Sequence, residues 1–179
     1  MRAEDEAEFR DYARARIVPL RRTAYLLCGD WHLADDLVQT TLTKLYVAWR
    51  RVNRREAVDG YTRQILVRSY LSERRRPWRR EHPTAVLPER AELGREGPGE
   101  RERLMSALAR VPPRQRAVLV LRYWDDNSVA TTAELLGCSE GTVKSQAARG
   151  LAALRGVLEI DNFELDSPSP ATAPRRELR

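Results

Sequence analysis

The chain has 179 residues, of which 42% are hydrophobic and only 7% aromatic, and its formal net charge at pH 7 is +6. This length allows one or two small domains, and the composition suits small helical bundles. No apolar run approaches the length of a membrane span, and the acidic start, Met1-Arg-Ala-Glu-Asp-Glu-Ala-Glu, is unlike a signal peptide. These features exclude a membrane-spanning or secreted class and favour a cytoplasmic protein.

Residues 1–80 predict a first helical lobe. An apolar stripe at helical spacing over residues 20–27 stops at Gly29, and Asp30 can cap the next helix. That second helix runs over residues 31–49, and a third is predicted over residues 61–76. One face of the second helix is polar and consists of Asp35, Asp36, Gln39, Thr40 and Thr43.

Positive charge is concentrated between Tyr61 and Arg80. This segment holds seven arginines and one glutamate, so its net charge of +6 equals that of the whole chain. A concentrated basic block beside Tyr61, Tyr70 and Trp78 attracts a phosphate backbone and offers rings to unstacked bases. A solvated, arginine-rich helix end is the alternative interpretation.

Residues 81–100 have no sustained period and are broken by proline and glycine, which predicts a flexible linker. A second helical lobe is predicted over residues 101–160, with Pro113 as the first residue of one of its helices. The tail, residues 161–179, is predicted to be disordered. The expected fold class is therefore all-α, with two small helical domains joined by a flexible linker.

A helix-turn-helix is predicted inside the second lobe, from Ser128 to Arg149. Gly137 stands where the turn needs a positive φ, and Ser139 is the N-cap candidate for the second helix. Val143 is expected to point back into the first helix. The opposite face of the second helix carries a polar stripe suited to the major groove, formed by Thr142, Ser145, Gln146 and Arg149. An ordinary helical hairpin with a solvated face is the alternative.

Neither catalytic nor metal-binding patterns stand out in the sequence. Cys28 and Cys138 are isolated, and each adjoins a glycine at an apolar helix end. We interpret both as small buried hydrophobic residues and not as a disulfide or redox pair. His32 and His82 have no cysteine or carboxylate at ligand spacing. The protein is therefore expected to be no enzyme and to need no metal or cofactor.

Two segments together resemble the sigma factors of bacterial RNA polymerase, specifically the small extracytoplasmic-function (ECF) branch and its sigma-E-like actinobacterial members. The first, which looks like the polymerase-binding region 2.2, is Ala34-Asp-Asp-Leu-Val-Gln-Thr-Thr-Leu-Thr-Lys-Leu-Tyr-Val-Ala-Trp49. The second, which looks like region 4 when joined to the helix-turn-helix, is Val111-Pro-Pro-Arg-Gln-Arg-Ala-Val-Leu-Val-Leu-Arg-Tyr-Trp124. The resemblance covers about residues 9–158 apart from the linker and implies a promoter-specificity subunit.

The resemblance also implies a role for each polar surface. The polar face of the second helix would bind core polymerase at its β′ clamp helices, with the β flap as a further contact. The minus-10 element would be held by Asn53, Arg54, Arg55, Tyr61, Arg63, Arg68, Arg74, Arg75 and Arg76. The minus-35 element would be recognised by Ser139, Glu140, Thr142, Lys144, Ser145, Gln146 and Arg149. An anti-sigma protein is a further partner that the resemblance implies.

Two other functions remain open from the sequence. One is a free-standing helix-turn-helix regulator, which would bind operator DNA by itself, usually as a dimer on a palindrome. The other is a helical adaptor whose arginine block binds RNA or another protein. The Asp-Leu-Val-Gln helix argues against both, because neither function needs a polymerase-docking face.

Overall fold

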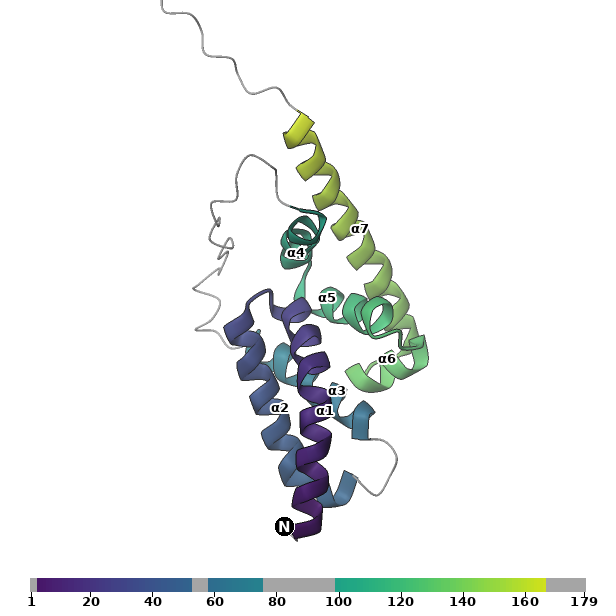
Figure 1. The fold of residues 1–179 in the computed structure, drawn as a ribbon. Coiled ribbons are helices and arrows are strands. Elements are labelled where there is room, and N and C mark those ends of the chain that lie inside the picture. Colours follow the sequence, from purple (N-terminus) through teal and green to yellow (C-terminus); the bar gives the residue numbers. More distant parts are fainter. Residues whose placement is uncertain (1–2, 53–57, 76–98, 167–179) are drawn as a thin grey trace, which may run out of the picture.

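The computed structural model describes residues 3–52, 58–75 and 99–166, and within these ranges every regular element is helical (Figure 1). The all-α class is therefore confirmed. The elements are α1 (Ala3–Cys28), α2 (Trp31–Val52), α3 (Val58–Glu73), α4 (Glu100–Arg110), α5 (Pro113–Leu119), the π-helical turn η3 (Val120–Trp124), α6 (Val129–Leu136) and α7 (Glu140–Asp166).

Local signals in the sequence set most helix boundaries. Gly29 takes a φ of 77° after α1, and the Asp30 carboxylate accepts a hydrogen bond from the Leu33 amide at 2.9 Å at the start of α2. Pro113 occupies the first turn of α5. The third helix differs from the prediction, because α3 starts at Val58 and ends at Glu73. The predicted disordered tail also differs, since α7 continues through residues 161–166.

The first lobe consists of α1, α2 and α3, with α3 packed against both other helices. Its N-terminal end is an aromatic cluster in which the Phe9 and Trp49 ring centroids lie 5.2 Å apart, edge to face. The Tyr12 hydroxyl donates to Asp59 at 2.9 Å and so joins α1 to α3. Burial raises the pKa of Tyr12 to about 12.

The second lobe consists of α4 to α7. Val118, Ala133 and Val143 form one buried cluster that joins α5, α6 and α7. Gly150 lets α5 and α7 approach closely, since a Cβ there would lie 3.1 Å from the Leu119 Cγ. The side of α7 that faces α5 therefore requires small residues.

The two lobes share their largest core, whereas the sequence predicts two separate helical domains joined by a flexible linker. This cluster contains buried residues of α1, α2, α3, α5, η3 and α6. Leu66 and Leu121, from different lobes, are both fully buried within it. Each lobe is too small to bury all of its apolar residues, and packing the lobes together removes that surface from water. The linker prediction for residues 81–100 lies almost entirely outside the described residues.

A buried arginine joins the lobes. Arg116 of α5 is 4% exposed, and its guanidinium donates to the Leu27 carbonyl of α1 at 2.9 Å. It also donates to the carbonyls of Ala109 and Val111, the latter at 3.2 Å. Burial lowers the pKa of Arg116, since desolvation disfavours its charge. Arg116 therefore pairs charge with carbonyl dipoles at the point where the two lobes meet.

We expect Arg116→Leu to lower the free energy of unfolding by about 3 kcal/mol, because buried carbonyl oxygens would lose their charged donor. Urea unfolding followed by the helical circular dichroism signal would measure this change. Arg114→Leu, at an exposed position of the same helix, is the matched control and should change stability by less than about 0.5 kcal/mol. Equal midpoints for the two variants would contradict the prediction.

Candidate nucleic-acid interface

The helix-turn-helix is formed by α6 and α7, as its sequence predicts. Ser128 caps α6, its hydroxyl accepting a hydrogen bond from the Thr131 amide at 3.0 Å. Gly137 then takes a φ of 65°, and the Cys138 amide bonds back to the Ala133 carbonyl at 3.0 Å. These bonds satisfy the free backbone groups at the end of α6 and fix the direction in which the chain leaves it.

A second serine starts α7. The Ser139 hydroxyl accepts a hydrogen bond from the Thr142 amide at 3.2 Å, the geometry of an N-cap. Val143, one turn into the helix, is fully buried against Val118 and Ala133. The cap and the buried valine together set the rotation of α7, and hence which of its residues face solvent.

The solvent-facing stripe of α7 includes Thr142, Ser145 and Arg149, all of them exposed, and Gln146 beside them is half-buried. At 3.6 residues per turn, Glu140 and Lys144 lie on the other side of the helix from this stripe. The Ser145 hydroxyl donates to the Thr142 carbonyl at 3.0 Å. Arg149 is exposed and makes no ion pair among the described residues. Of the predicted minus-35 residues, the structure thus brings four onto one face, while Glu140 and Lys144 lie on the other side of α7 and Ser139 caps its start.

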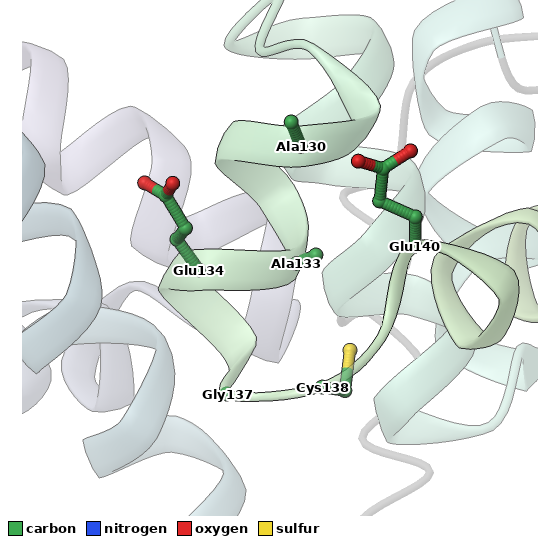
Figure 2. A pocket seen from close by; sticks show the side chains of 6 residues that line it. All are labelled: Ala130, Ala133, Glu134, Gly137, Cys138 and Glu140. Atoms are coloured by element: carbon green, nitrogen blue, oxygen red, sulfur yellow. The ribbon is translucent and has the colours of Figure 1, made fainter.

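Glu140 lies beside a shallow groove between α6 and α7, shown in Figure 2. The groove has a volume of about 450 Å³, and its lining residues are Ala130, Ala133, Glu134, Gly137, Cys138 and Glu140. Figure 2 shows the Glu134 and Glu140 side chains on opposite sides of α6. Because carboxylates repel phosphates, this groove is unsuited to a nucleic-acid backbone, and the exposed face of α7 is the better candidate.

The basic residues predicted for the minus-10 element follow α3. Tyr61 and Arg68 share one side of the helix, whereas Arg63 lies on another, with its Nε 3.6 Å from the Asp125 carboxylate of the second lobe. Asp125 is 10% exposed, and burial raises its pKa, an effect that the hydrogen bond from Thr23 and the charge of Arg63 oppose.

Arg74 and Arg75 follow α3 in a turn and are exposed. The Arg74 guanidinium lies 3.5 Å from the Cys28 carbonyl and 5.8 Å from the Tyr70 ring centroid. It therefore faces the end of α1 as well as solvent. The other predicted minus-10 residues, Asn53, Arg54, Arg55 and Arg76, lie outside the described residues.

The polar face predicted on α2 is solvent-exposed, and its members Asp35, Asp36, Gln39, Thr40 and Thr43 line one side of the helix. Asp35 is already paired, because Arg21 of α1 donates to both of its oxygens, at 2.5 and 3.0 Å. Asp36, Gln39 and Thr40 are exposed, and their side chains have no hydrogen-bond or ion-pair partner among the described residues.

Both lobes match known families. Residues 10–80 match Sigma-70 region 2, and residues 101–154 match Sigma-70, region 4. The RNA polymerase sigma-E factor of Streptomyces avermitilis is 38% identical over 173 residues, covering 96% of this chain and 93% of that protein. This chain belongs to the ECF sigma factors. It is a promoter-specificity subunit of bacterial RNA polymerase, and the free-standing regulator is not favoured.

Further relatives agree with this assignment. The ECF RNA polymerase sigma factor SigM of Mycobacterium tuberculosis is 32% identical over 159 residues, covering 87% of this chain and 80% of that protein. The sigma factor RpoE of Bartonella quintana, solved in complex with the anti-sigma factor NepR, matches with a TM-score of 0.64. That match has 24% identity and covers 84% of this chain and 98% of the other, so it supports the fold. Within the described ranges, no helix of the sigma factor has the length and apolarity to cross a membrane.

Sequence reasoning missed an apolar surface beside the polar face of α2. A groove of about 730 Å³ runs between α1 and α2 of the sigma factor, with Ile17 and Val18 on one side and Leu42 and Tyr46 on the other. Val47, on the same face as Asp36, Thr40 and Thr43, is 83% exposed. An apolar residue at position 47, within a polar helical stripe, is the feature of the sequence that could have indicated an apolar contact surface on α2.

We expect Ser139→Ala to reduce the free energy of unfolding by about 1 kcal/mol, because the Thr142 amide at the start of α7 would lose its acceptor. Thermal and urea unfolding of the full chain would measure the loss. Ser139→Asp keeps an N-cap acceptor and should retain most of the stability. A similar loss of stability in Ser139→Asp would contradict the prediction, because that variant still provides an acceptor for the Thr142 amide.

Proposed function

We propose that this sigma factor binds core polymerase through α2 and the adjoining apolar groove, recognises the minus-35 element with α7, and holds the melted minus-10 strand with α3. The observation that carries the proposal is the exposure of two separate polar surfaces, one on α2 and one on α7, on different lobes. One chain can then contact a protein with one lobe and duplex DNA with the other.

The α2 surface has the composition of a protein interface. An apolar strip with Ile17, Leu42 and Tyr46 adjoins a rim of polar and acidic side chains. Stable interfaces combine a dry apolar centre with a hydrated polar rim, and acidic side chains speed association with a basic partner. Core polymerase, at its β′ clamp helices, is the partner that we assign to this surface, with the β flap as a contact of the second lobe.

The α7 surface has the composition of a major-groove reader. Gln146 and Arg149 are long enough to reach base edges from the exposed stripe, while Lys144, on the other side of α7, is assigned only a phosphate contact. The Thr142 hydroxyl is hydrogen-bonded to the Ser139 hydroxyl, and the Ser145 hydroxyl donates to the Thr142 carbonyl. Both side chains are short, so they suit close contact with the DNA backbone. Specificity at the minus-35 element therefore depends mainly on the two long side chains.

We infer that the subunit acts in the cytoplasm and performs no catalysis, since the polymerase supplies the chemistry. An anti-sigma protein is a further proposed partner. Support comes from the Bartonella quintana sigma factor, which is solved in complex with one. The exposed groove between α1 and α2 offers such a partner an apolar docking surface.

Asp36→Arg should weaken binding to core polymerase at least about tenfold, because it reverses a solvent-directed charge at the centre of the proposed docking face. Fluorescence anisotropy of the labelled full chain, titrated with Streptomyces core polymerase, would measure the affinity. Glu102→Arg makes the same charge change at an exposed position of α4 and is the control. Unchanged affinity for Asp36→Arg would remove α2 from the interface.

Arg149→Ala should reduce transcription from promoters that depend on a minus-35 element by about tenfold or more, since one good base contact contributes about 1–3 kcal/mol. Run-off transcription from a pool of GC-rich genomic promoter fragments, with and without the sigma factor, would map the starts. Arg155→Ala is the matched control, because Arg155 is exposed on another face of α7. Equal losses for both variants would point to general electrostatics and against recognition by Arg149.

A further inference from the structure

The exposed stripe of α7 carries two long polar side chains whose hydrogen-bonding groups are unused. Gln146 and Arg149 make no side-chain hydrogen bond or ion pair within the ranges that the structure describes. The two shorter members of the stripe differ, because the Thr142 hydroxyl bonds to the Ser139 hydroxyl and the Ser145 hydroxyl donates to the Thr142 carbonyl. Gln146 and Arg149 are therefore the members of the stripe with wholly unused donors.

No acidic residue competes for the Arg149 guanidinium on its own helix. Arg149 is exposed, and the residues three and four positions away on α7 are all uncharged. The nearest carboxylates along the helix belong to Glu140 and Glu159, nine and ten residues away, or about 14 Å at the rise of an α-helix. A guanidinium without an internal partner keeps all of its donors for a ligand.

Gln146 lies at the border between the exposed stripe and the core. It is half-buried, since Val143, three residues before it, and Gly150, four residues after it, are both buried on the side of α7 that faces α5. Partial burial restricts the side chain while its amide stays unbonded. A restricted side chain loses less conformational entropy on binding, which favours one defined contact.

Small residues occupy the side of α7 opposite the buried Val143. Gly141, Ser145 and Ala148 are exposed there, at the spacing of one helix face. A surface of small side chains lets the helix approach the floor of the major groove, which is wide enough to admit an α-helix. Gln146 and Arg149 can then extend to base edges from one border of that surface.

The two free groups match different bases. The Gln146 amide has both a donor and an acceptor, which fit the N7 acceptor and the N6 donor of adenine. The Arg149 guanidinium has donors only, which fit the O6 and N7 acceptors of guanine. Exchanging the two bases would place the adenine amino group against a donor and the guanine O6 against the amide oxygen. Each side chain therefore discriminates against the base that the other accepts.

The spacing of the two residues sets the spacing of the two bases. Gln146 and Arg149 are three residues apart, which is about 4.5 Å along the helix and about 60° around it. Successive base pairs of duplex DNA are about 3.4 Å apart. Two side chains that leave one border of the helix at this separation reach neighbouring base pairs.

We propose that the minus-35 element of this sigma factor contains an adenine bound by Gln146 and, on the adjacent base pair, a guanine bound by Arg149, each through two hydrogen bonds. Lys144, on the other side of α7, contacts a phosphate and selects no base. This inference rests on the proposed role of α7 in recognising the minus-35 element. It adds which bases the helix selects and that they are neighbours.

A randomised promoter tests the assignment. The holoenzyme is assembled from the full chain and Streptomyces core polymerase, and a promoter that it uses receives random bases through the upstream element and a barcode in the transcribed part. Sequencing the transcripts gives the base preference at each position. The wild type should favour an A·T pair beside a G·C pair, each at least about fivefold over the other bases.

Two substitutions of Gln146 should change one preference in different directions. Gln146→Glu keeps the shape of the side chain but has no donor, so the preference should move from adenine to cytosine, whose N4 amino group a carboxylate accepts. Gln146→Arg should move it to guanine. Both variants should keep the neighbouring guanine, which Arg149→Ala should relax. Lys144→Ala is the control and should lower transcription of all promoters while both preferences stay.

The outcomes separate this inference from the function on which it rests. An unchanged adenine preference in both Gln146 variants, or preferences of Gln146 and Arg149 that map to base pairs that are not adjacent, would overturn the inference. In either case a relaxed preference in Arg149→Ala would keep α7 as the reader of the element. If neither the Gln146 variants nor Arg149→Ala change any upstream preference, the proposed role of α7 fails as well.

Discussion

The C-terminal end of α1 is the point on which the arrangement of both lobes depends. The last carbonyls of a helix have no partner inside the helix and carry partial negative charge. Arg116 donates to the Leu27 carbonyl from α5, and Arg74 reaches the Cys28 carbonyl from the turn after α3. Two guanidinium groups from different lobes therefore converge on one helix end.

This convergence explains how a charged residue is accommodated in the shared core. Burying a guanidinium costs several kcal/mol unless hydrogen bonds replace its water. Carbonyls from α1 and from the junction of α4 and α5 provide these bonds for Arg116. A planar guanidinium offers five donors in a fixed fork and can reach acceptors on different helices, whereas a lysine offers three donors on a single nitrogen. The orientation of α5, and with it the helix-turn-helix, is thereby fixed relative to α1.

The sequence predicts those features that depend on neighbouring residues. Asp30, Gly137 and Ser139 act on amides or torsions within a few positions, so the helix starts and the turn follow directly from them. The sequence does not show which segment of the chain an apolar stripe packs against. Leu66 and Leu121 are both apolar, but no local pattern shows that they belong to one core shared by the two lobes.

The candidate site likewise has features that one helix alone predicts and features that depend on how two helices pack. The polar faces of α2 and α7 follow from helical periodicity, and the structure finds both exposed. The groove between α1 and α2 needs two helices to be placed side by side, so the pattern of either helix alone does not reveal it. The pairing of Arg63 with Asp125 likewise joins residues 62 positions apart, across the predicted linker.

The contact between the two lobes combines an apolar core with a weak ion pair. The apolar part of the shared core favours closure, but Asp125 contributes little, since its buried Oδ2 lacks a hydrogen bond and stands 3.6 Å from Arg63. An imperfect ion pair lowers the free energy needed to open the chain. A ligand shifts such an equilibrium only by its difference in affinity for the two states.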